Sequence, residues 1–283
     1  MLPGTIEPNP RATYRVAHAD DALLVVEKPP GRVTLPGRGH ETDSLLNGLF
    51  VDHAAALQRL GKERSFGVMH RLDRETSGLV MVAKSIEAYD ALDTQLRAGG
   101  IAKFYYAVVK RAPNKPVGAI DRPLVEYQGE ARTPLGQRAE KLKLVRVASS
   151  GKRSTTAYRV LSSSEGGALL ECRAVTGRLH QVRAHLASIR CPVLGDRFYA
   201  NAAVADAAPR LALHAHRIVL THPVTGKPID ARSKLPKDIR QVCRRLGISL
   251  PSSGGGSGGG DGSGVDGEHG VGADPVGDQQ AGV

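Results

Sequence analysis

Apolar residues recur at helical spacing in four stretches of the chain, and capping residues mark where two of these stretches begin and end. Asp43 or Ser44 can cap the first stretch, which stops at Gly61. Ser85 can cap the second stretch, which stops at Gly99. The patterns predict helices over residues 45–60, 86–98, 179–188 and 236–246.

Shorter apolar runs, several with alternating polar positions, predict β-strands between the helices. Most of them are joined by Gly, Ser or Pro clusters, which suit antiparallel hairpins better than repeated βαβ crossovers. We therefore expect an α+β fold with a mixed, largely antiparallel central sheet, flanking helices and a central cleft. The predicted strands are Tyr14–Ala17, Leu23–Lys28, Leu79–Ala83, Ala102–Lys110, Val117–Glu126, Lys141–Val147, Thr155–Ser162, Ala168–Val175 and Leu211–Thr221.

Composition divides the chain into a short lead (residues 1–12), one folded domain (13–250) that would carry any catalytic site, and a Gly-rich acidic tail (251–283). The tail is predicted to be disordered, because it has too few apolar residues to form a core. It contains five of the 28 acidic residues and none of the 39 Lys and Arg, so the net charge of +11 becomes +16 without it. A body this basic makes a nucleic acid the first partner to consider.

Other classes of protein are excluded by what the sequence lacks. Cys172, Cys191 and Cys243 are far apart and form no C-x-x-C motif, so neither a disulfide framework nor a zinc–cysteine site is expected. No stretch approaches the ~18 apolar residues of a membrane-spanning helix, and the N-terminus has no signal-peptide pattern. The sequence predicts a soluble cytoplasmic protein.

The histidines do not form a metal-binding pattern. His180 and His185 are five positions apart, so they do not share a helix face as an i, i+4 metal pair would. His214 and His216 project from one side of a predicted strand among apolar neighbours, which favours structural histidines over ligands. No metal site is expected.

Asp73 lies in a loop just before an apolar strand, with Arg71 and Arg74 beside it. A carboxylate next to arginines should be ionised and could act as a nucleophile or a base. Gly78, two residues after Thr76, can take a positive φ and let the backbone approach a ligand closely. The alternative is that Asp73 caps a local turn, and its spacing alone favours that alternative.

A second polar cluster occupies Thr176–Leu186, where a strand turns at Gly177 and enters a helix. The free N–H groups of a helix N-terminus suit a phosphate or a carboxylate. Arg178, Arg183 and Arg190 gather here, although they could equally form a solvated face.

Two tyrosines stand side by side in a third segment, Lys103–Ala107. Tyr105 and Tyr106 should lie on opposite faces of one strand, one towards a core and the other towards a cleft. A phenol in a cleft can stack on a nucleobase and take part in proton transfer, whereas a buried phenol with one hydrogen bond is the commoner case.

Together these segments resemble the RluA-type family of pseudouridine synthases. His70–Asp73 followed by Thr76–Gly78 matches the family's H-R-L-D-x-x-T-S-G signature. Further blocks follow in the family's order over roughly Asp20 to Pro236. These blocks are Val26–Gly31, Lys103–Ala107, Thr176–Leu186, Pro192–Asp196 and Leu213–Ala215.

The resemblance implies the pseudouridine synthase fold and an enzyme that isomerises uridine in RNA without a cofactor. Asp73 would be the catalytic carboxylate, Tyr105 would lie against the target base, and Arg183 would pair with the carboxylate. Arg71 is the family position that can enter the RNA stack in place of the flipped nucleotide. The remaining expected RNA contacts are Arg74, Thr76, Arg178 and His180.

The resemblance also suggests a monomer acting on a stem-loop in tRNA or rRNA, and a family member that lacks an N-terminal S4-type domain. It does not decide whether Asp73 attacks the sugar or removes its C2′ proton. Two other functions stay open at this point. One is a non-catalytic RNA-binding or assembly factor with the same fold. The other is glycosidase-like hydrolysis by Asp73 and Glu75, which lie close together in one turn.

Overall fold

The computed structural model describes residues 6–130 and 141–250 of the 283-residue chain. The predicted disordered tail and the first five residues of the predicted lead lie outside the described residues. Part of the lead is packed on the fold, because the N–H of Asn9 donates to the carbonyl of Asn47 and Ala12 is only 1% exposed.

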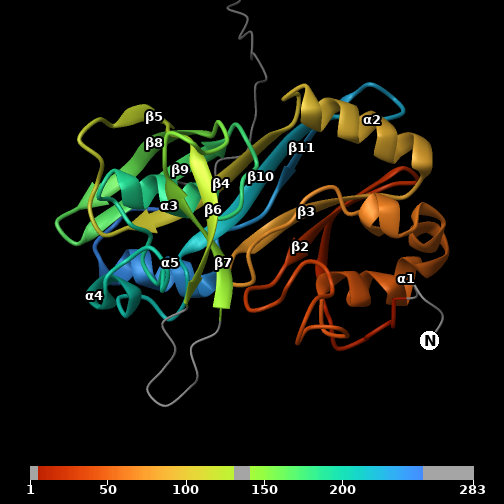
Figure 1. Ribbon diagram of the computed structural model, residues 1–283, viewed down its shortest axis with the longest axis horizontal. Helices are drawn as coiled ribbons and strands as arrows, with labels where there is room; N and C mark the ends of the chain where they lie inside the picture. The colour runs from red at the N-terminus through yellow and green to blue at the C-terminus, as the bar shows by residue number, and fades with distance from the viewer. Residues whose placement is uncertain (1–5, 131–140, 251–283) are drawn as a thin grey trace, which may run out of the picture. The chain divides into compact units, whose positions relative to one another are not determined.

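A nine-stranded sheet forms the centre of the described structure, with strand order β1-β2-β3-β10-β4-β9-β8-β5 and with β11 paired to β10 (Figure 1). Only β3 and β10 pair in parallel, so the prediction of a mixed, largely antiparallel sheet is confirmed. The strands are β1 (Arg15–Ala19), β2 (Leu23–Lys28), β3 (Ser77–Ala83), β4 (Ala102–Val109), β5 (Val117–Asp121), β8 (Thr155–Ser164), β9 (Gly167–Ala174), β10 (Leu213–Thr221) and β11 (Pro228–Arg232). A separate hairpin consists of β6 (Leu124–Glu130) and β7 (Lys141–Val147).

The predicted helix starts are confirmed by their caps. The hydroxyl of Ser44 accepts the N–H of Asn47, whose side chain in turn accepts the N–H of Ser44. Ser85 caps the second helix through the N–H of Ala88. The helices are α1 (Leu45–Leu60), α2 (Ile86–Arg97), α3 (Gln181–Ser188), α4 (Ala202–Ala205) and α5 (Lys237–Arg245), with a 3₁₀ segment η1 (Lys62–Gly67) after α1.

The structure corrects the prediction of one strand over Val117–Glu126. This segment forms β5 and β6, which belong to different sheets and are separated at Arg122 and Pro123. Proline has no N–H to donate to a ladder, so the strand cannot run through it. Two helical segments, η1 and α4, and the edge strand β11 were not predicted from the sequence.

Helices α1 and α2 pack against opposite faces of β2 and β3 (Figure 1). Because side chains alternate along a strand, one set of residues packs with α1 and the other with α2. Burial on both faces explains why β3 is apolar along almost its whole length. The set on the α1 side is Leu24, Val26, Val80 and Val82, and the set on the α2 side is Leu23, Val25, Leu79 and Met81. A further core joins β4, β8 and β9 with α3 and α5.

Candidate active site

The loop before β3 is held by alternate residues that point inwards. His70 Nε2 accepts the N–H of Met81 at 3.2 Å, and Leu72 exchanges two 3.1 Å hydrogen bonds with the Thr34 hydroxyl. Burial lowers the pKa of His70 to about 3, so the ring remains neutral and able to accept. His70 and Leu72 are fixed in this way. Asp73 directly follows Leu72 and lies at the surface of the fold, with a side chain that is 20% exposed.

Lys28, at the end of β2, also holds the loop that carries Asp73. Its side chain is 1% exposed, and its Nζ donates to the carbonyls of Pro29, Arg32 and Arg74 at 2.9, 2.6 and 3.1 Å. Burial lowers the pKa of Lys28 to about 7, and the charge of the nearby Asp73 partly opposes this shift. Lys28 is therefore a buried link between the end of β2 and the residue that follows Asp73.

Arg183 connects two carboxylates. Its Nη1 lies 2.9 Å from Asp73 Oδ2. Its Nε lies 2.8 Å from Asp196 Oδ2, and its Nη2 lies 2.8 Å from Asp196 Oδ1. The side chains of Arg183 and Asp196 are 5% and 0% exposed. One Asp196 oxygen also accepts the N–H groups of Phe198 and Tyr199 at 2.9 and 3.1 Å. Asp196 therefore fixes the guanidinium, which presents its remaining edge to Asp73.

The protonation states agree with this geometry. Burial alone would lower the pKa of Arg183, but the hydrogen bonds and charges of Asp196 and Asp73 raise it. Burial would likewise raise the pKa of Asp196, but Arg183 and the two N–H donors lower it. The buried pair is thus ionised throughout the neutral range.

Tyr105 lies on β4 opposite Ala215 of β10 and packs against the α1 core. Burial and then the charge of Asp73 raise its pKa well above the ordinary value. Tyr105 is therefore a neutral phenol beside the carboxylate. Its neighbour Tyr106 points to the other face and stacks on His216 with ring centroids 3.6 Å apart, so the predicted opposite orientation is confirmed.

His180, which was expected to contact RNA, belongs to the same cluster as Asp73. Its Nε2 lies 3.9 Å from Asp73 Oδ1, and its Nδ1 lies 2.9 Å from the hydroxyl of Tyr199. That hydroxyl also accepts the N–H of Val145 at 3.0 Å, so His180, Tyr199 and β7 are linked in one hydrogen-bonded chain. Burial lowers the pKa of His180, so the ring is neutral.

The other expected RNA contacts divide into exposed and buried residues. Arg71 and Arg178 are exposed, and the Arg74 side chain is 56% exposed and paired with Glu75. Thr76 does not fit the expectation of an RNA contact, because its side chain is inside the fold and only 2% exposed. It follows Asp73 in a turn that directs the chain into β3.

Gln181 fixes the turn that leads into the helix N-terminus expected to receive a phosphate, and no side chain of the described residues caps the helix itself. Gln181 Oε1 accepts the N–H of Arg178 at 3.1 Å and the hydroxyl of Thr176 at 2.6 Å. Its amide nitrogen donates to the carbonyl of Thr155 at 2.9 Å. The side chain of Gln181 thus ties the turn before α3 to β8.

Gly78 and His214 join β3 to β10. Gly78 has φ +118, and a Cβ there would lie 2.2 Å from the carbonyl oxygen of Ala215. The sequence predicted that the backbone at Gly78 approaches a ligand. In the structure it approaches a neighbouring strand, β10. His214 lies between the hydroxyls of Ser77 and Ser233 at 2.9 and 3.0 Å, which confirms the prediction of a structural histidine.

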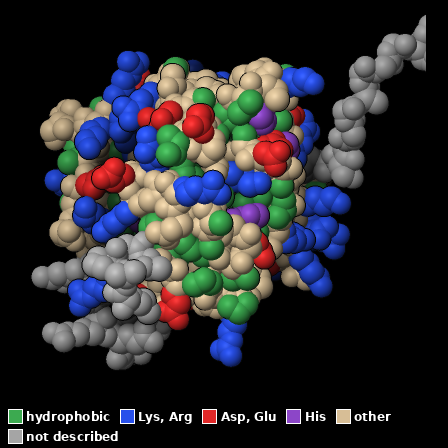
Figure 2. Space-filling model, turned by 90° about the vertical axis from the view of Figure 1, so that its right-hand side faces the viewer, with side chains coloured by type: hydrophobic (Ala, Val, Ile, Leu, Met, Phe, Trp, Pro, Cys, Tyr) green, Lys and Arg blue, Asp and Glu red, His purple; other side chains and the backbone are tan. Residues whose placement is uncertain are grey.

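Among residues 6–130 and 141–250, no group of three or more His, Cys, Asp or Glu side chains is arranged to hold a metal ion. No helix in the same residues is long and apolar enough to cross a membrane. Lys and Arg side chains outnumber Asp and Glu on the face of the fold shown in Figure 2 and are spread across it.

Residues 22–188 match the family described as RNA pseudouridylate synthase. The ribosomal large subunit pseudouridine synthase D of Zymomonas mobilis is 35% identical over 241 residues, which are 83% of this chain and 73% of that protein. The chain belongs to the RNA pseudouridine synthase family.

Two further similarities agree with this membership. The ribosomal large subunit pseudouridine synthase D of Nitrosomonas europaea is 35% identical over 246 residues, covering 84% of this chain and 67% of that protein. The solved structure of human RNA Pseudouridylate Synthase Domain Containing 4 superposes with a TM-score of 0.63 at 26% identity, covering 84% and 95% of the two chains. This family member is an isomerase of uridine in RNA, and the predicted fold class is confirmed.

Proposed function

We propose that Asp73 is the catalytic carboxylate of this pseudouridine synthase, that Arg183 orients it, and that Tyr105 lies against the target base. The observation that carries the proposal is the 2.9 Å contact between Arg183 Nη1 and Asp73 Oδ2, with Arg183 itself anchored by the fully buried Asp196. A partly exposed carboxylate held by a fixed guanidinium keeps one position while its other oxygen stays available to a substrate.

The reaction moves the uracil from an N1–C1′ bond to a C5–C1′ bond without changing its composition. The uridine must first leave the RNA stack to reach Asp73. Asp73 then either attacks C1′ or removes the C2′ proton, and both routes release the uracil so that it can turn and rejoin through C5. The C5 proton must finally be removed. A Tyr105 phenol of raised pKa can pass on a proton while remaining neutral, which favours relay over a phenolate base.

RNA capture is assigned to exposed arginines around the site. Arg71 is exposed two residues before Asp73, Arg74 directly follows Asp73, and Arg178 precedes α3. Their charge is part of the net charge of +16 that the chain carries without its tail. Arg71 has a long planar side chain with no ion pair among the described residues, which suits insertion into the space left by a flipped nucleotide.

We propose large-subunit ribosomal RNA as the substrate, in a stem-loop, because the relatives at 35% identity are named for that RNA. The same substrate implies action in the cytoplasm. Asp73, Tyr105 and Arg183 all come from one chain, which supports a monomeric enzyme, and the mass in solution measured by light scattering tests this.

The test is pseudouridine mapping in total RNA from a strain that lacks the protein, before and after incubation with purified enzyme. Wild type should add pseudouridine to large-subunit rRNA, and Asp73→Asn should add none. Glu75→Gln is the matched control, because it removes a carboxylate two positions away that is 42% exposed and paired with Arg74. Full activity of Asp73→Asn would falsify the catalytic assignment, and loss of activity in Glu75→Gln would support the paired-carboxylate alternative. Pseudouridine gained only in tRNA would refute the rRNA substrate.

A further inference from the structure

A cavity of about 280 Å³ lies between the β4–β5 loop and the turn after α3. It is on the same sheet face as the candidate active site. Tyr105 of β4 pairs with Cys172 of β9, and Cys172 pairs with Tyr158 of β8, whose side chain lines the cavity. Strands are ~4.8 Å apart, so Tyr105 and Tyr158 are separated by ~10 Å. The cavity is lined by Arg111, Ala112, Pro113, Asn114, Lys115, Tyr158, Ile189, Arg190 and Cys191.

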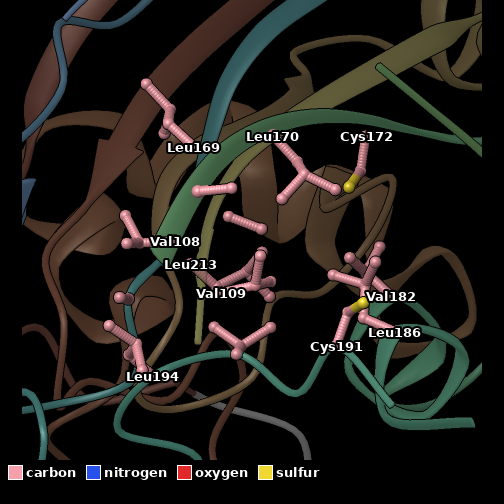
Figure 3. Close-up of a cluster of buried hydrophobic side chains, with 14 of the residues drawn as sticks. Val108, Val109, Leu169, Leu170, Cys172, Val182, Leu186, Cys191, Leu194 and Leu213 are labelled. Carbon is pink, nitrogen blue, oxygen red and sulfur yellow. The ribbon is translucent and has the colours of Figure 1, made fainter. Parts of the chain in front are cut away.

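Helix α3 connects the two places. Its first turn carries Arg183, which contacts Asp73, and its last turn leads into Ile189 and Arg190 at the cavity. Eight residues of helix span ~12 Å. Cys191 lies beside Val182 and Leu186 in the core (Figure 3), so the inner wall of the cavity is part of the packed interior.

The charge of the cavity lining is entirely positive. Arg111, Lys115 and Arg190 are exposed at its rim, and none of them forms an ion pair with a carboxylate of the described residues. Asp and Glu are absent from the lining. At the floor, Tyr158 is 9% exposed, and its hydroxyl makes no hydrogen bond to another described residue. Three cations, a free phenol and an apolar floor together match a phosphate joined to a planar ring.

Arg190 occupies a backbone position that usually holds glycine. Its φ is 60, its N–H donates to the carbonyl of Ala187, and the N–H of Cys191 donates to that of Leu186. This is the Schellman ending of a helix, in which glycine is the least strained residue at the left-handed position. Arginine at that position is unfavourable for the backbone, so a role of its side chain would explain its presence.

We propose that this cavity binds one nucleotide of the substrate RNA, away from the uridine that reacts. Its phosphate would contact Arg111, Lys115 and Arg190, and its ring would rest on Tyr158. A volume of about 280 Å³ is at the small end of ligand pockets, which fits one nucleotide. The proposal rests on the proposed function only in that the substrate is RNA, and it adds a second anchoring point for that RNA.

Arg190→Gly tests the side chain without harming the helix end. The melting temperature should stay the same or rise, because glycine suits the left-handed position. Affinity for an rRNA fragment should fall about three- to fivefold, and the slope of log K against log salt should decrease by about one. Lys115→Ala should weaken binding similarly. Lys227→Ala is the matched control, because Lys227 is an exposed lysine in the β10–β11 turn and is not part of the cavity lining.

Equal affinities and salt slopes for Arg190→Gly, Lys115→Ala and the Lys227→Ala control would overturn the proposal, and so would a wild-type protein that does not bind the fragment. Binding is measured directly, so a wild type that binds RNA but forms no pseudouridine would refute the proposed function and leave this proposal standing.

A second measurement identifies what the cavity recognises. Uridine monophosphate, uridine and inorganic phosphate are each titrated while the ring signals of Tyr158 are followed by NMR. The monophosphate should shift these signals at the lowest concentration, and the shift should require higher concentrations in Arg190→Gly. Equal responses to inorganic phosphate and to the monophosphate would refute a nucleotide site.

Discussion

Replacing Asp196 with asparagine tests whether the buried carboxylate, and not Asp73, holds Arg183 in place. Asparagine has nearly the same shape, but it removes the charge and replaces one acceptor oxygen with a donor. In the native structure the two oxygens of Asp196 accept from Arg183 and from the N–H groups of Phe198 and Tyr199. At least one of these donors must therefore face another donor in the variant.

The size of the effect follows from burial. Removing one partner of a buried ion pair costs about 3–5 kcal/mol, and the lower end applies because Asp73 still contacts Arg183. A loss of ~3 kcal/mol lowers the melting temperature of a domain of this size by roughly 6–12 °C. Asp73→Asn should behave differently. Its side chain is 20% exposed and solvent screens its charge, so we expect a loss of ~1 kcal/mol, although activity is abolished.

Melting curves and pseudouridine formation are measured together, with the activity assay run well below the lower melting temperature. Asp196→Asn should lose both stability and activity, because a loosened Arg183 no longer positions Asp73. Asp206→Asn is the control, since Asp206 is exposed and forms no ion pair with the described residues. The reasoning is refuted if Asp196→Asn melts within about 1 °C of wild type or if it retains full activity as a folded protein.

Two further predictions concern buried groups. Lys28→Met should lower the free energy of unfolding by ~3 kcal/mol, because three buried carbonyls lose their donor. Removing a buried charge offsets only part of this loss. Urea unfolding measures the change, and a midpoint equal to that of wild type would contradict it. His70 and His214 each have a pKa lowered by burial to about 3 from 6.5, so the unfolded chain takes up protons that the folded protein does not. Stability should be complete above pH 6.5 and fall by several kcal/mol as the pH drops towards 3. Melting temperatures from pH 8 to 4 check this, and a flat profile below pH 6 would contradict it.

The parts of the fold that the sequence predicted well are those that local chemistry determines. Ser44 and Ser85 cap helices where the spacing placed them, and Gly61 ends α1 with φ 66. The parts that it missed depend on tertiary partners. The strand β11 is short and exposed on alternate residues, and its pairing with β10 is what makes it a strand. Pro123 was the local signal for the break between β5 and β6, and the apolar run around it concealed that signal.

Only those parts of the site that belong to sequence motifs could be predicted. Asp73 and Arg183 do meet, as the resemblance implies, but the resemblance gives no role to Asp196, which lies in the matching block Pro192–Asp196. The Gly195-Asp196 pair within that block was the local signal for it, and the structure shows why the glycine is there, since its φ is 78. Lys28 also lies in a matching block, Val26–Gly31, but its burial had no local signal, because a lysine at the end of a strand normally extends into solvent. Its burial results from three carbonyls that come together only in the folded chain.

One row of paired residues across three strands explains why the sequence patterns around Asp73 and Tyr105 could not predict how these two residues lie relative to each other. Gly78 of β3 pairs with Ala215 of β10, and Ala215 pairs with Tyr105 of β4. The loop carrying Asp73 therefore reaches Tyr105 only because β10, which comes more than a hundred residues later in the chain, lies between β3 and β4. A Cβ at Gly78 would lie 2.2 Å from the Ala215 carbonyl, so a larger residue there would push β10 and β3 apart. The glycine of the signature thus sets the spacing between Asp73 and Tyr105 through a strand that the signature does not contain.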